Sequence, residues 1–98
     1  MEKRTPHASL NVIKSLVAEG NVRTTISSRV GATALGLNFD GMVSVVLKLS
    51  EANFYKSMTT HADHTVWQDV YHFGTVSGDI YLKLTVMDDV LIVSFKEL

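Results

Sequence analysis

Residues 79–96 read DIYLKLTVMDDVLIVSFK, which is two alternating runs of apolar and polar side chains separated by Asp88-Asp89. Alternation with a period of two is typical of strands that bury one face, and a short polar link between two such runs favours a hairpin turn. With Asp88 and Asp89 as the turn, the apolar face pairs Leu82 with Phe95, Leu84 with Val93 and Val86 with Leu91. The other face pairs Tyr81 with Lys96, Lys83 with Ser94 and Thr85 with Ile92. We therefore expect a hairpin whose apolar face is covered by the rest of the chain.

The alternation continues upstream in two further segments, Phe54–Thr60 and Val66–Val76. With Asp79–Met87 and Val90–Lys96 they give four strands joined by short links, which predicts an antiparallel meander. A Ser77-Gly78 turn puts Gln68, Val70 and His72 on the Tyr81 face and Trp67, Tyr71 and Phe73 on the core face. Asp69 then points toward the core, where a carboxylate does not fit. Lys56 and Met58 share a face, and Lys56 can lie across from Gln68.

The first half of the chain favours helices. Thr5-Pro6 predicts a helix start, because a hydroxyl cap followed by proline at the first helical position suits a helix N-terminus. Apolar residues then recur at helical spacing, at Leu10, Ile13, Leu16 and Val17. Gly20 is expected to end this helix. Val22 and its neighbours predict a short strand.

Two more helices are expected before the strands begin. Thr24 and Thr25 can cap a helix over Ile26–Leu35, although Gly31 inside it disfavours a helix. Asp40 is expected to cap the next helix, whose shared apolar face consists of Met42, Val45, Val46 and Leu49. The β-branched residues of this segment leave a strand as the alternative. Helices packed on one face of the sheet make the expected fold class α+β.

The amino-acid composition excludes several classes of protein. The 98 residues are 46% hydrophobic, so we expect one domain over residues 1–98 with a modest core. The absence of cysteine excludes disulfides and Cys-ligated zinc or iron–sulfur sites. No apolar run is long enough for a bilayer span and no signal-type segment follows the charged N-terminus, so we expect a soluble cytoplasmic protein. The net charge is −1, so any nucleic-acid partner must be recognised by a local patch.

The predicted polar sheet face provides such a patch. It collects cations, an amide, an imidazole and a phenol: Lys56, Gln68, His72, Tyr81, Lys83 and Lys96. With no carboxylate expected from these strands, the set suits a phosphate, although an ordinary solvated sheet face is the alternative. In a flat sheet the Lys56/Gln68 row lies about 20 Å from the Tyr81/Lys96 row. Either twist and a bulge near Gly74–Gly78 bring the rows together, or they line a long groove, or the register is wrong.

Other polar clusters have simpler structural explanations. His61-Ala62-Asp63-His64 and Asp88-Asp89 contain metal-ligand residue types, but both are more typical of turns. Lys3-Arg4 with Lys14 is more simply a solvated helix end than a phosphate contact. The sequence contains no nucleophile elbow and no nucleotide-binding glycine loop, so no metal and no cofactor is predicted.

Six longer blocks carry a resemblance that covers the chain essentially from end to end. They are MEKRTPH (1–7), VRTT (22–25), LNFDGM (37–42), FYKSMTT (54–60), WQDVY (67–71) and DVLIVSFKE (89–97). In these blocks the chain resembles the MqsR toxin family of bacterial toxin–antitoxin modules. The resemblance implies a RelE-like fold, an antiparallel sheet with helices on one face. It also implies a ribosome-independent ribonuclease that cuts mRNA at GCU- or GCA-type triplets, and an MqsA-type antitoxin with a zinc-binding and a helix-turn-helix domain.

The resemblance places the family's active-site residues at Lys56, Gln68, Tyr81 and Lys96, all on the polar face. Met58, His72 and Lys83 are expected to contact RNA beside them. A member of the family carries Arg-Pro-Arg where this chain has His72-Phe73-Gly74, and His where it has Asp88. These departures remove positive charge, so a catalytically weakened module that binds protein or RNA is the alternative function.

The expected chemistry is a metal-independent attack of the substrate's own 2′-hydroxyl on the adjacent phosphorus. Lys56 and Lys96 suit the charge of the phosphorane, Tyr81 can donate to the leaving oxygen, and Gln68 can orient the 2′-hydroxyl or read a base edge. Neighbouring cations are expected to lower the pKa values of the lysines and of Tyr81. His72 is a candidate for acid–base work, because its ordinary pKa lies near neutrality.

Overall fold

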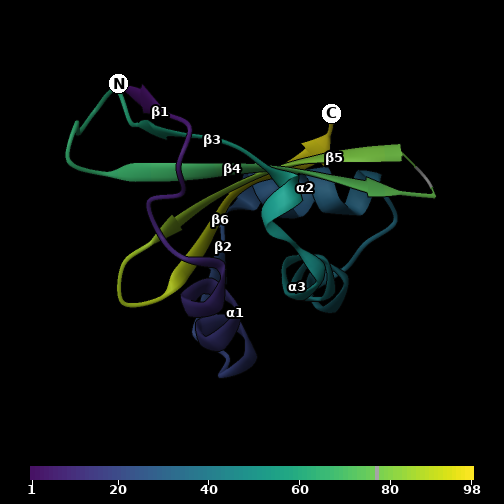
Figure 1. The fold of residues 1–98 in the computed structure, drawn as a ribbon. Coiled ribbons are helices and arrows are strands. Elements are labelled where there is room, and N and C mark those ends of the chain that lie inside the picture. The colour runs from purple at the N-terminus through teal and green to yellow at the C-terminus, as the bar shows by residue number, and fades with distance from the viewer. Residues whose placement is uncertain (77) are drawn as a thin grey trace.

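Six strands form one mixed sheet in the structure, a computed structural model that describes residues 1–76 and 78–98. The strands are β1 (Glu2–Lys3), β2 (Val22–Thr24), β3 (Phe54–Thr59), β4 (Trp67–Thr75), β5 (Gly78–Val86) and β6 (Val90–Glu97). The helices are α1 (Leu10–Ala18), α2 (Ile26–Ala34) and α3 (Phe39–Lys48), and α3 is followed by the short 3-10 helix η1 (Glu51–Asn53). The strands lie in the order β1-β3-β4-β5-β6-β2 (Figure 1).

The meander predicted for the second half of the chain is confirmed, because β3, β4, β5 and β6 pair antiparallel in sequence order. The first half of the chain adds an edge strand on each side. The strand expected at Val22 is confirmed as β2, and it pairs parallel with β6. The other edge strand, β1, pairs antiparallel with β3 and is one that the alternation pattern does not predict. The N-terminal segment therefore lies against the strands that carry the polar face.

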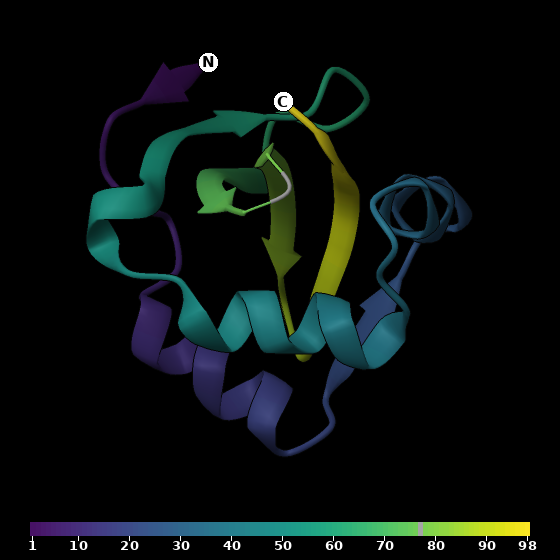
Figure 2. The same cartoon turned by 90° about the vertical axis from the view of Figure 1, so that its right-hand side faces the viewer.

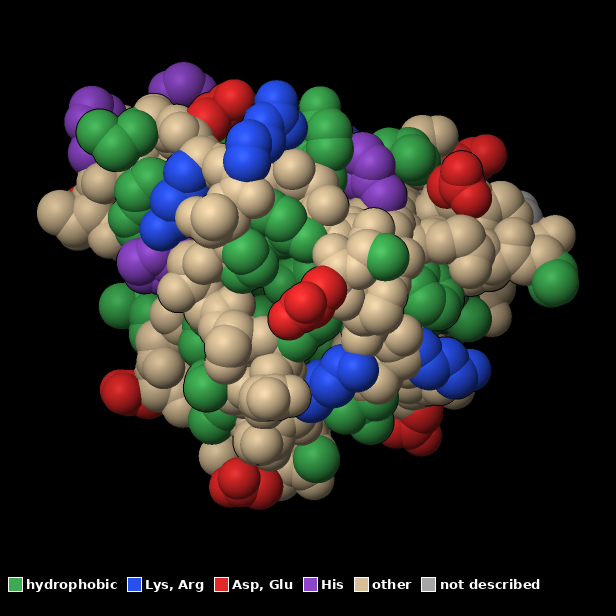
Figure 3. Space-filling model, viewed as in Figure 1, with side chains coloured by type: hydrophobic (Ala, Val, Ile, Leu, Met, Phe, Trp, Pro, Cys, Tyr) green, Lys and Arg blue, Asp and Glu red, His purple; other side chains and the backbone are tan. Residues whose placement is uncertain are grey.

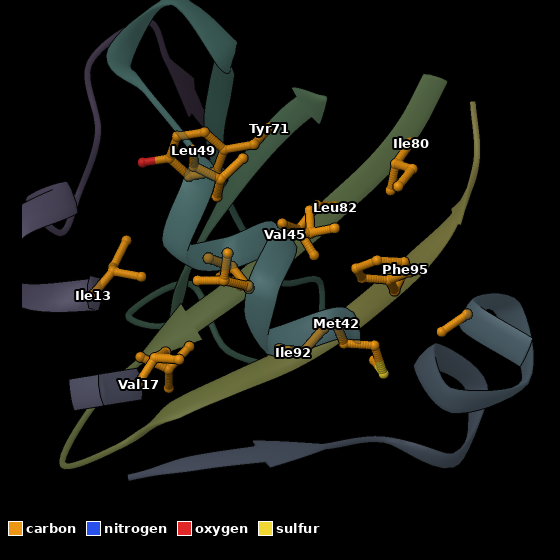
Figure 4. Packing of buried hydrophobic residues seen from close by; sticks show 14 residues of the cluster. Ile13, Val17, Met42, Val45, Leu49, Tyr71, Ile80, Leu82, Ile92 and Phe95 are labelled. Carbon is orange, nitrogen blue, oxygen red and sulfur yellow. The ribbon is translucent and has the colours of Figure 1, made fainter. Parts of the chain in front are cut away.

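The helices occupy two places around this sheet. α1 and α3 cover one face, as predicted, whereas α2 lies beside β6 at the edge of the sheet (Figures 1 and 2). The apolar face predicted for the third helix is confirmed, since Met42, Val45, Val46 and Leu49 are all buried. Figure 4 shows how Ile13 and Val17 from α1 and Val45 and Met42 from α3 meet the buried face of the sheet. The opposite face of β3 to β6 is called the open face below.

The first helix begins later than the sequence predicts. Its N-cap is Ser9 rather than Thr5. Asp69 explains the difference, because its buried carboxylate accepts the two backbone N–H groups of His7 and Ala8 just before the helix and holds that segment out of the helix. The same contacts account for a carboxylate on the core side of β4. The predicted stop at Gly20 is confirmed, with a φ of +85° that glycine adopts at little steric cost.

The N-caps of α2 and α3 are both short polar residues, as expected. Only the N-cap of α2 is the residue that the sequence predicts. Thr25 caps α2 as predicted. Asn38 caps α3 through its side-chain oxygen, and Asp40 lies in the first turn instead. Gly31 has a packing reason inside α2, because a Cβ at this position would lie 1.9 Å from the carbonyl oxygen of Phe95. The glycine therefore lets α2 lie directly against the backbone of β6.

The β5–β6 hairpin keeps the predicted register only in the half that lies away from the turn. Tyr81 pairs with Lys96, Leu82 with Phe95 and Lys83 with Ser94, as predicted. A bulge between Lys83 and Leu84 then shifts the register, so Leu84 faces Ile92 and Val86 faces Val90. The predicted pairs Leu84–Val93, Val86–Leu91 and Thr85–Ile92 are therefore wrong, and Ile92 lies in the core.

The β4–β5 hairpin keeps the predicted faces but is shifted by two residues. His72 lies directly opposite Tyr81, and Gly78 pairs with Thr75 as the first residue of β5. Ser77, the other residue of the predicted turn, lies outside the described residues. A shift of two residues leaves each side chain on its predicted face, because the side-chain period of a strand is two.

Over the described residues, no single helix is both long and apolar enough to cross a bilayer. Among the helices that the structure describes, α2 and α3 reach that length and composition only when taken together, and they are bent by 88° at their junction.

Candidate nucleic-acid interface

The centre of the candidate site is a row of side chains across three strands of the open face. His72 of β4, Tyr81 of β5 and Lys96 of β6 lie opposite one another in the register. The ring centroids of His72 and Tyr81 are 5.9 Å apart, and the Nζ of Lys96 lies 5.3 Å from the Tyr81 centroid. The structure thus brings together an imidazole, a phenol and an ammonium that the sequence places on one face.

A bulge in β3 adds a further aromatic residue, Tyr55, that the sequence reasoning missed. The register shifts between Phe54 and Lys56, so Phe54 packs edge-on against the core residue Tyr71 while Lys56 turns to the open face. Tyr55 stacks on His72 with the ring centroids 4.4 Å apart. The sequence contained a signal for this bulge, because alternation would put the apolar Phe54 and the charged Lys56 on one face. Only an extra residue between them places Phe54 in the core and Lys56 on the open face.

Lys56 is paired with a carboxylate from β1. Its Nζ lies 2.6 Å from the Oε1 of Glu2, which reaches it from the neighbouring edge strand. The hydrogen bond to Glu2 raises the pKa of Lys56 above its ordinary value, and the same bond lowers the pKa of Glu2. The expectation that neighbouring cations lower the pKa of Lys56 is therefore wrong. At neutral pH this pair is an ammonium beside a carboxylate.

Two other residues of the open face have pKa values set mainly by burial. Burial raises the pKa of Tyr81, and the nearby Lys56 opposes this shift only in part, so the expected lowering of the Tyr81 pKa is wrong. Burial also lowers the pKa of Lys83, and the charge of Lys96 lowers it further, as expected for neighbouring cations. A half-buried ammonium beside a second cation gains stability from a bound anion.

Gln68 and Met58 lie farther along the face. They are paired with each other, so the prediction that Lys56 lies opposite Gln68 is wrong, and Lys56 pairs with Val70 instead. Gln68 is four residues from His72 along β4, which is about 13 Å. Lys56 belongs to the row between them. The candidate residues therefore occupy three successive rows, closer together than the sequence predicts.

The open face also carries carboxylates, which the sequence reasoning did not expect. Glu2 enters from β1, as described above. Asp79 lies two residues before Tyr81 on β5 and shares its face by alternation. It is exposed at the end of the hairpin and pairs with Gly74 in the register.

Residues 1–8 form an N-terminal arm that is bound along β3 and β4. The backbone N–H of Thr59 donates to the Met1 carbonyl at 3.0 Å, and the Nζ of Lys3 lies 4.2 Å from the centroid of the Trp67 ring. Arg4 donates to the carbonyl of Tyr55 at 3.4 Å. Lys3 and Arg4 thus belong to the arm. The interpretation from the sequence, that they lie at a solvated helix end, is wrong for these two residues. Figure 3 shows Lys, Arg and His side chains gathered over the region where the arm, β3 and β4 lie in Figure 1.

The two turn clusters have structural partners. Asp63 accepts hydrogen bonds from the backbone and the hydroxyl of Thr65 at 2.8 and 2.6 Å. Asp89 forms an ion pair with Arg23 of β2, which ties the β5–β6 turn to the parallel edge strand. In the part of the chain that the structure describes, no group of three or more His, Asp or Glu side chains is arranged to hold a metal ion.

The fold and the open face together define a class of protein: a small α+β protein with a basic and aromatic sheet face suited to a phosphate backbone. Within that class the chain belongs to the MqsR toxin family, whose model, described as "Motility quorum-sensing regulator, toxin of MqsA", matches residues 5–97. The chain is 62% identical over 97 residues to the mRNA interferase toxin MqsR of Escherichia coli (strain K12), and the match covers 99% of each chain. The family resemblance seen in the sequence is confirmed.

Proposed function

We propose that this protein is an mRNA interferase, an endoribonuclease that acts as the toxin of a toxin–antitoxin pair. The finer parts of the proposal are that it cuts mRNA without the ribosome at GCU- or GCA-type triplets, and that the reaction uses no metal ion. Family membership and the identity to an mRNA interferase toxin support the class of activity. The observation that carries the chemistry is the row of His72, Tyr81 and Lys96 next to the row of Lys56 and Lys83.

The open face has the features that a bound RNA backbone needs. Lys56, Lys83 and Lys96 provide ammonium groups for phosphate oxygens, and the lowered pKa of Lys83 reflects a cation that an anion would stabilise. Stacked Tyr55 and His72 offer an aromatic surface beside them, on which a base can stack. The full set of candidate residues occupies three rows, so a stretch of RNA several nucleotides long would contact it.

The proposed reaction is attack of the 2′-hydroxyl on the adjacent phosphorus, which leaves a 2′,3′-cyclic phosphate and a 5′-hydroxyl. Lys56 stays charged because of Glu2, so it suits electrostatic stabilisation of the phosphorane and not proton removal. Tyr81 stays protonated because of burial, so its hydroxyl suits donation to the departing 5′-oxygen. Lys96 lies over the Tyr81 ring and would bind a phosphate oxygen. Gln68, Met58 and His72 would position the nucleotides around the cut.

The proposal includes a protein partner. The family is described as the toxin of MqsA, so we propose an MqsA-type antitoxin, zinc-binding and with a helix-turn-helix domain, as the cognate partner. No direct DNA contact by this chain is proposed. Residues 1–98 would act as one toxin domain in the cytoplasm, where the mRNA substrate is found.

The test is cleavage of end-labelled RNAs that contain or lack a single GCU or GCA triplet, in excess EDTA. The wild-type protein is expected to cut only at the triplet and to leave a 2′,3′-cyclic phosphate end. Lys56→Ala is expected to reduce the rate at least 100-fold, in line with the loss of one group that stabilises transition-state charge. Tyr81→Phe is expected to reduce it by a similar factor.

Two variants serve as matched controls for this test. Lys48→Ala removes an exposed lysine on α3, on the covered side of the sheet, and Tyr71→Phe removes a buried hydroxyl on the core side. Both are expected to cleave like the wild type. An RNA that stays intact but binds the protein would refute the enzymatic proposal and favour the binding module. Cleavage that EDTA abolishes would refute its metal-independent part.

A further inference from the structure

The proposed reaction needs a group that takes the proton of the 2′-hydroxyl. His72, the acid–base candidate from the sequence, lies directly opposite Tyr81 and therefore beside the expected acid, not on the far side of the phosphate. Lys56 and Tyr81 do not supply the base either. Lys56 is held in its charged form by Glu2, and burial keeps Tyr81 protonated. A base must be unprotonated at the working pH and must lie beside the cations that bind the phosphate. Glu2 meets both conditions, because its carboxylate accepts a hydrogen bond from the Lys56 ammonium at 2.6 Å.

Glu2 is placed firmly on this face although it lies near the start of the chain. Its strand β1 pairs with β3, with Glu2 opposite Met58 and Lys3 opposite Ser57. The rest of the N-terminal arm is held by the contacts of Lys3 with Trp67 and of Arg4 with the Tyr55 carbonyl. The side chain of Glu2 is 53% exposed, which leaves it accessible to a bound nucleotide.

The order of the rows gives Glu2 the correct side of the scissile phosphate. Attack by the 2′-oxygen and departure of the 5′-oxygen occur on opposite sides of phosphorus, so the base and the acid must also lie on opposite sides. Glu2 lies in the row of Met58, Tyr81 lies two rows away, and the row of Lys56 is between them. The other carboxylate of the face, Asp79, lies beyond Tyr81 on the acid side.

On the basis of the proposed function, we propose that Glu2 is the general base of the RNA cleavage reaction, with Lys56 binding the phosphate between Glu2 and Tyr81. The O2′–H bond breaks and the proton passes to the Glu2 carboxylate. The O2′–P bond forms as the P–O5′ bond breaks, and the 5′-oxygen takes the proton of the Tyr81 hydroxyl. Glu2 then loses its proton to solvent and Tyr81 regains one, which restores the starting state.

The experiment is a single-turnover pH–rate profile between pH 5 and 9 with a GCU-containing RNA, for the wild type, Glu2→Gln, Glu2→Asp and Asp79→Asn. Glutamine keeps an oxygen that accepts the Lys56 hydrogen bond but cannot take a proton. We expect Glu2→Gln to be about 100-fold slower at pH 7, with a rate that rises about tenfold per pH unit as hydroxide replaces the base. Glu2→Asp should recover part of the rate with a flat profile, and Asp79→Asn should match the wild type.

A binding measurement separates loss of the base from loss of structure. With an RNA that carries a 2′-deoxynucleotide at the cleavage position, Glu2→Gln is expected to bind at least as tightly as the wild type. Wild-type rates in Glu2→Gln, or a slow rate with an unchanged pH profile, would overturn the role of Glu2 while leaving the proposed function intact. If the wild type and Asp79→Asn also fail to cleave, the proposed function itself is refuted and this role with it.

Discussion

Replacing Asp69 by asparagine should release the N-terminal arm and destabilise the fold. Asp69 is 2% exposed, and its two carboxylate oxygens accept the backbone N–H groups of His7 and Ala8, each at 3.0 Å. Asparagine has nearly the same shape but only one accepting oxygen. Its NH₂ group would therefore face one of the two backbone N–H groups, so that a buried donor meets a donor.

The size of the effect follows from the two hydrogen bonds. A hydrogen bond to a charged group contributes about 1.5–3 kcal/mol, and a neutral one about 0.5–1.5 kcal/mol. Asp69→Asn removes one charged bond and weakens the other, which gives a loss of about 2–4 kcal/mol. A domain of this size has a free energy of unfolding of roughly 5–15 kcal/mol, so the loss is a large fraction of the total.

Urea unfolding followed by circular dichroism measures this loss, and amide hydrogen exchange locates it. The amides of His7 and Ala8 should exchange much faster in Asp69→Asn than in the wild type. Ser57→Ala is the matched control, because Ser57 lies opposite Asp69 in the register, is equally buried, and has a hydroxyl with no hydrogen-bond partner among the described residues. An Asp69→Asn protein within 0.5 kcal/mol of the wild type, with both amides still protected, would refute the reasoning.

Three further substitutions test the packing and the electrostatics of the fold. Tyr71→Phe should raise the free energy of unfolding by about 1 kcal/mol in a urea titration, because the Tyr71 hydroxyl is buried with no hydrogen-bond partner among the described residues. Gly31→Ala should lower it by about 1–3 kcal/mol, because the new Cβ collides with the Phe95 carbonyl. Arg23 holds the pKa of Asp89 below its ordinary value of 3.8, so this stabilisation is present above that pH and is lost as the pH falls through the lower, folded-state pKa. Asp89→Asn should therefore weaken the dependence of the urea midpoint on pH below about 4.

The elements that the sequence predicts well are those whose pattern is local. The meander follows from alternation, and the buried face of α3 follows from helical spacing, so both are confirmed. The helix start at Thr5 is wrong because Asp69, far away in the sequence, competes for the backbone of that segment. The register predicted beyond Lys83 is wrong because of a bulge. A bulge leaves hardly any trace in the alternation of apolar and polar residues, but it shifts every later pair of the hairpin.

The candidate site was predictable in its cations and its phenol but not in its full composition. Lys56, Tyr81 and Lys96 share a face by alternation alone, and the structure places them in adjacent rows. Tyr55 joins them only through the bulge in β3. Glu2 joins them only because β1 adds to the sheet, which no periodicity in a two-residue strand can signal.

The net charge of the whole chain is a poor guide to the local charge of the open face, and the position of the N-terminal arm is part of the reason. The net charge of −1 suggests little attraction for RNA, yet the ammonium groups of Lys56, Lys83 and Lys96 lie within two adjacent rows. One of them, Lys56, is neutralised by Glu2 in the free protein. A phosphate that binds Lys56 would release the Glu2 carboxylate from its ion pair at the place where a proton must be removed. The Glu2 carboxylate thus competes with the phosphate for Lys56 in the free protein and takes the proton in the reaction, so RNA affinity and base catalysis should respond in opposite directions when Glu2 is replaced by glutamine.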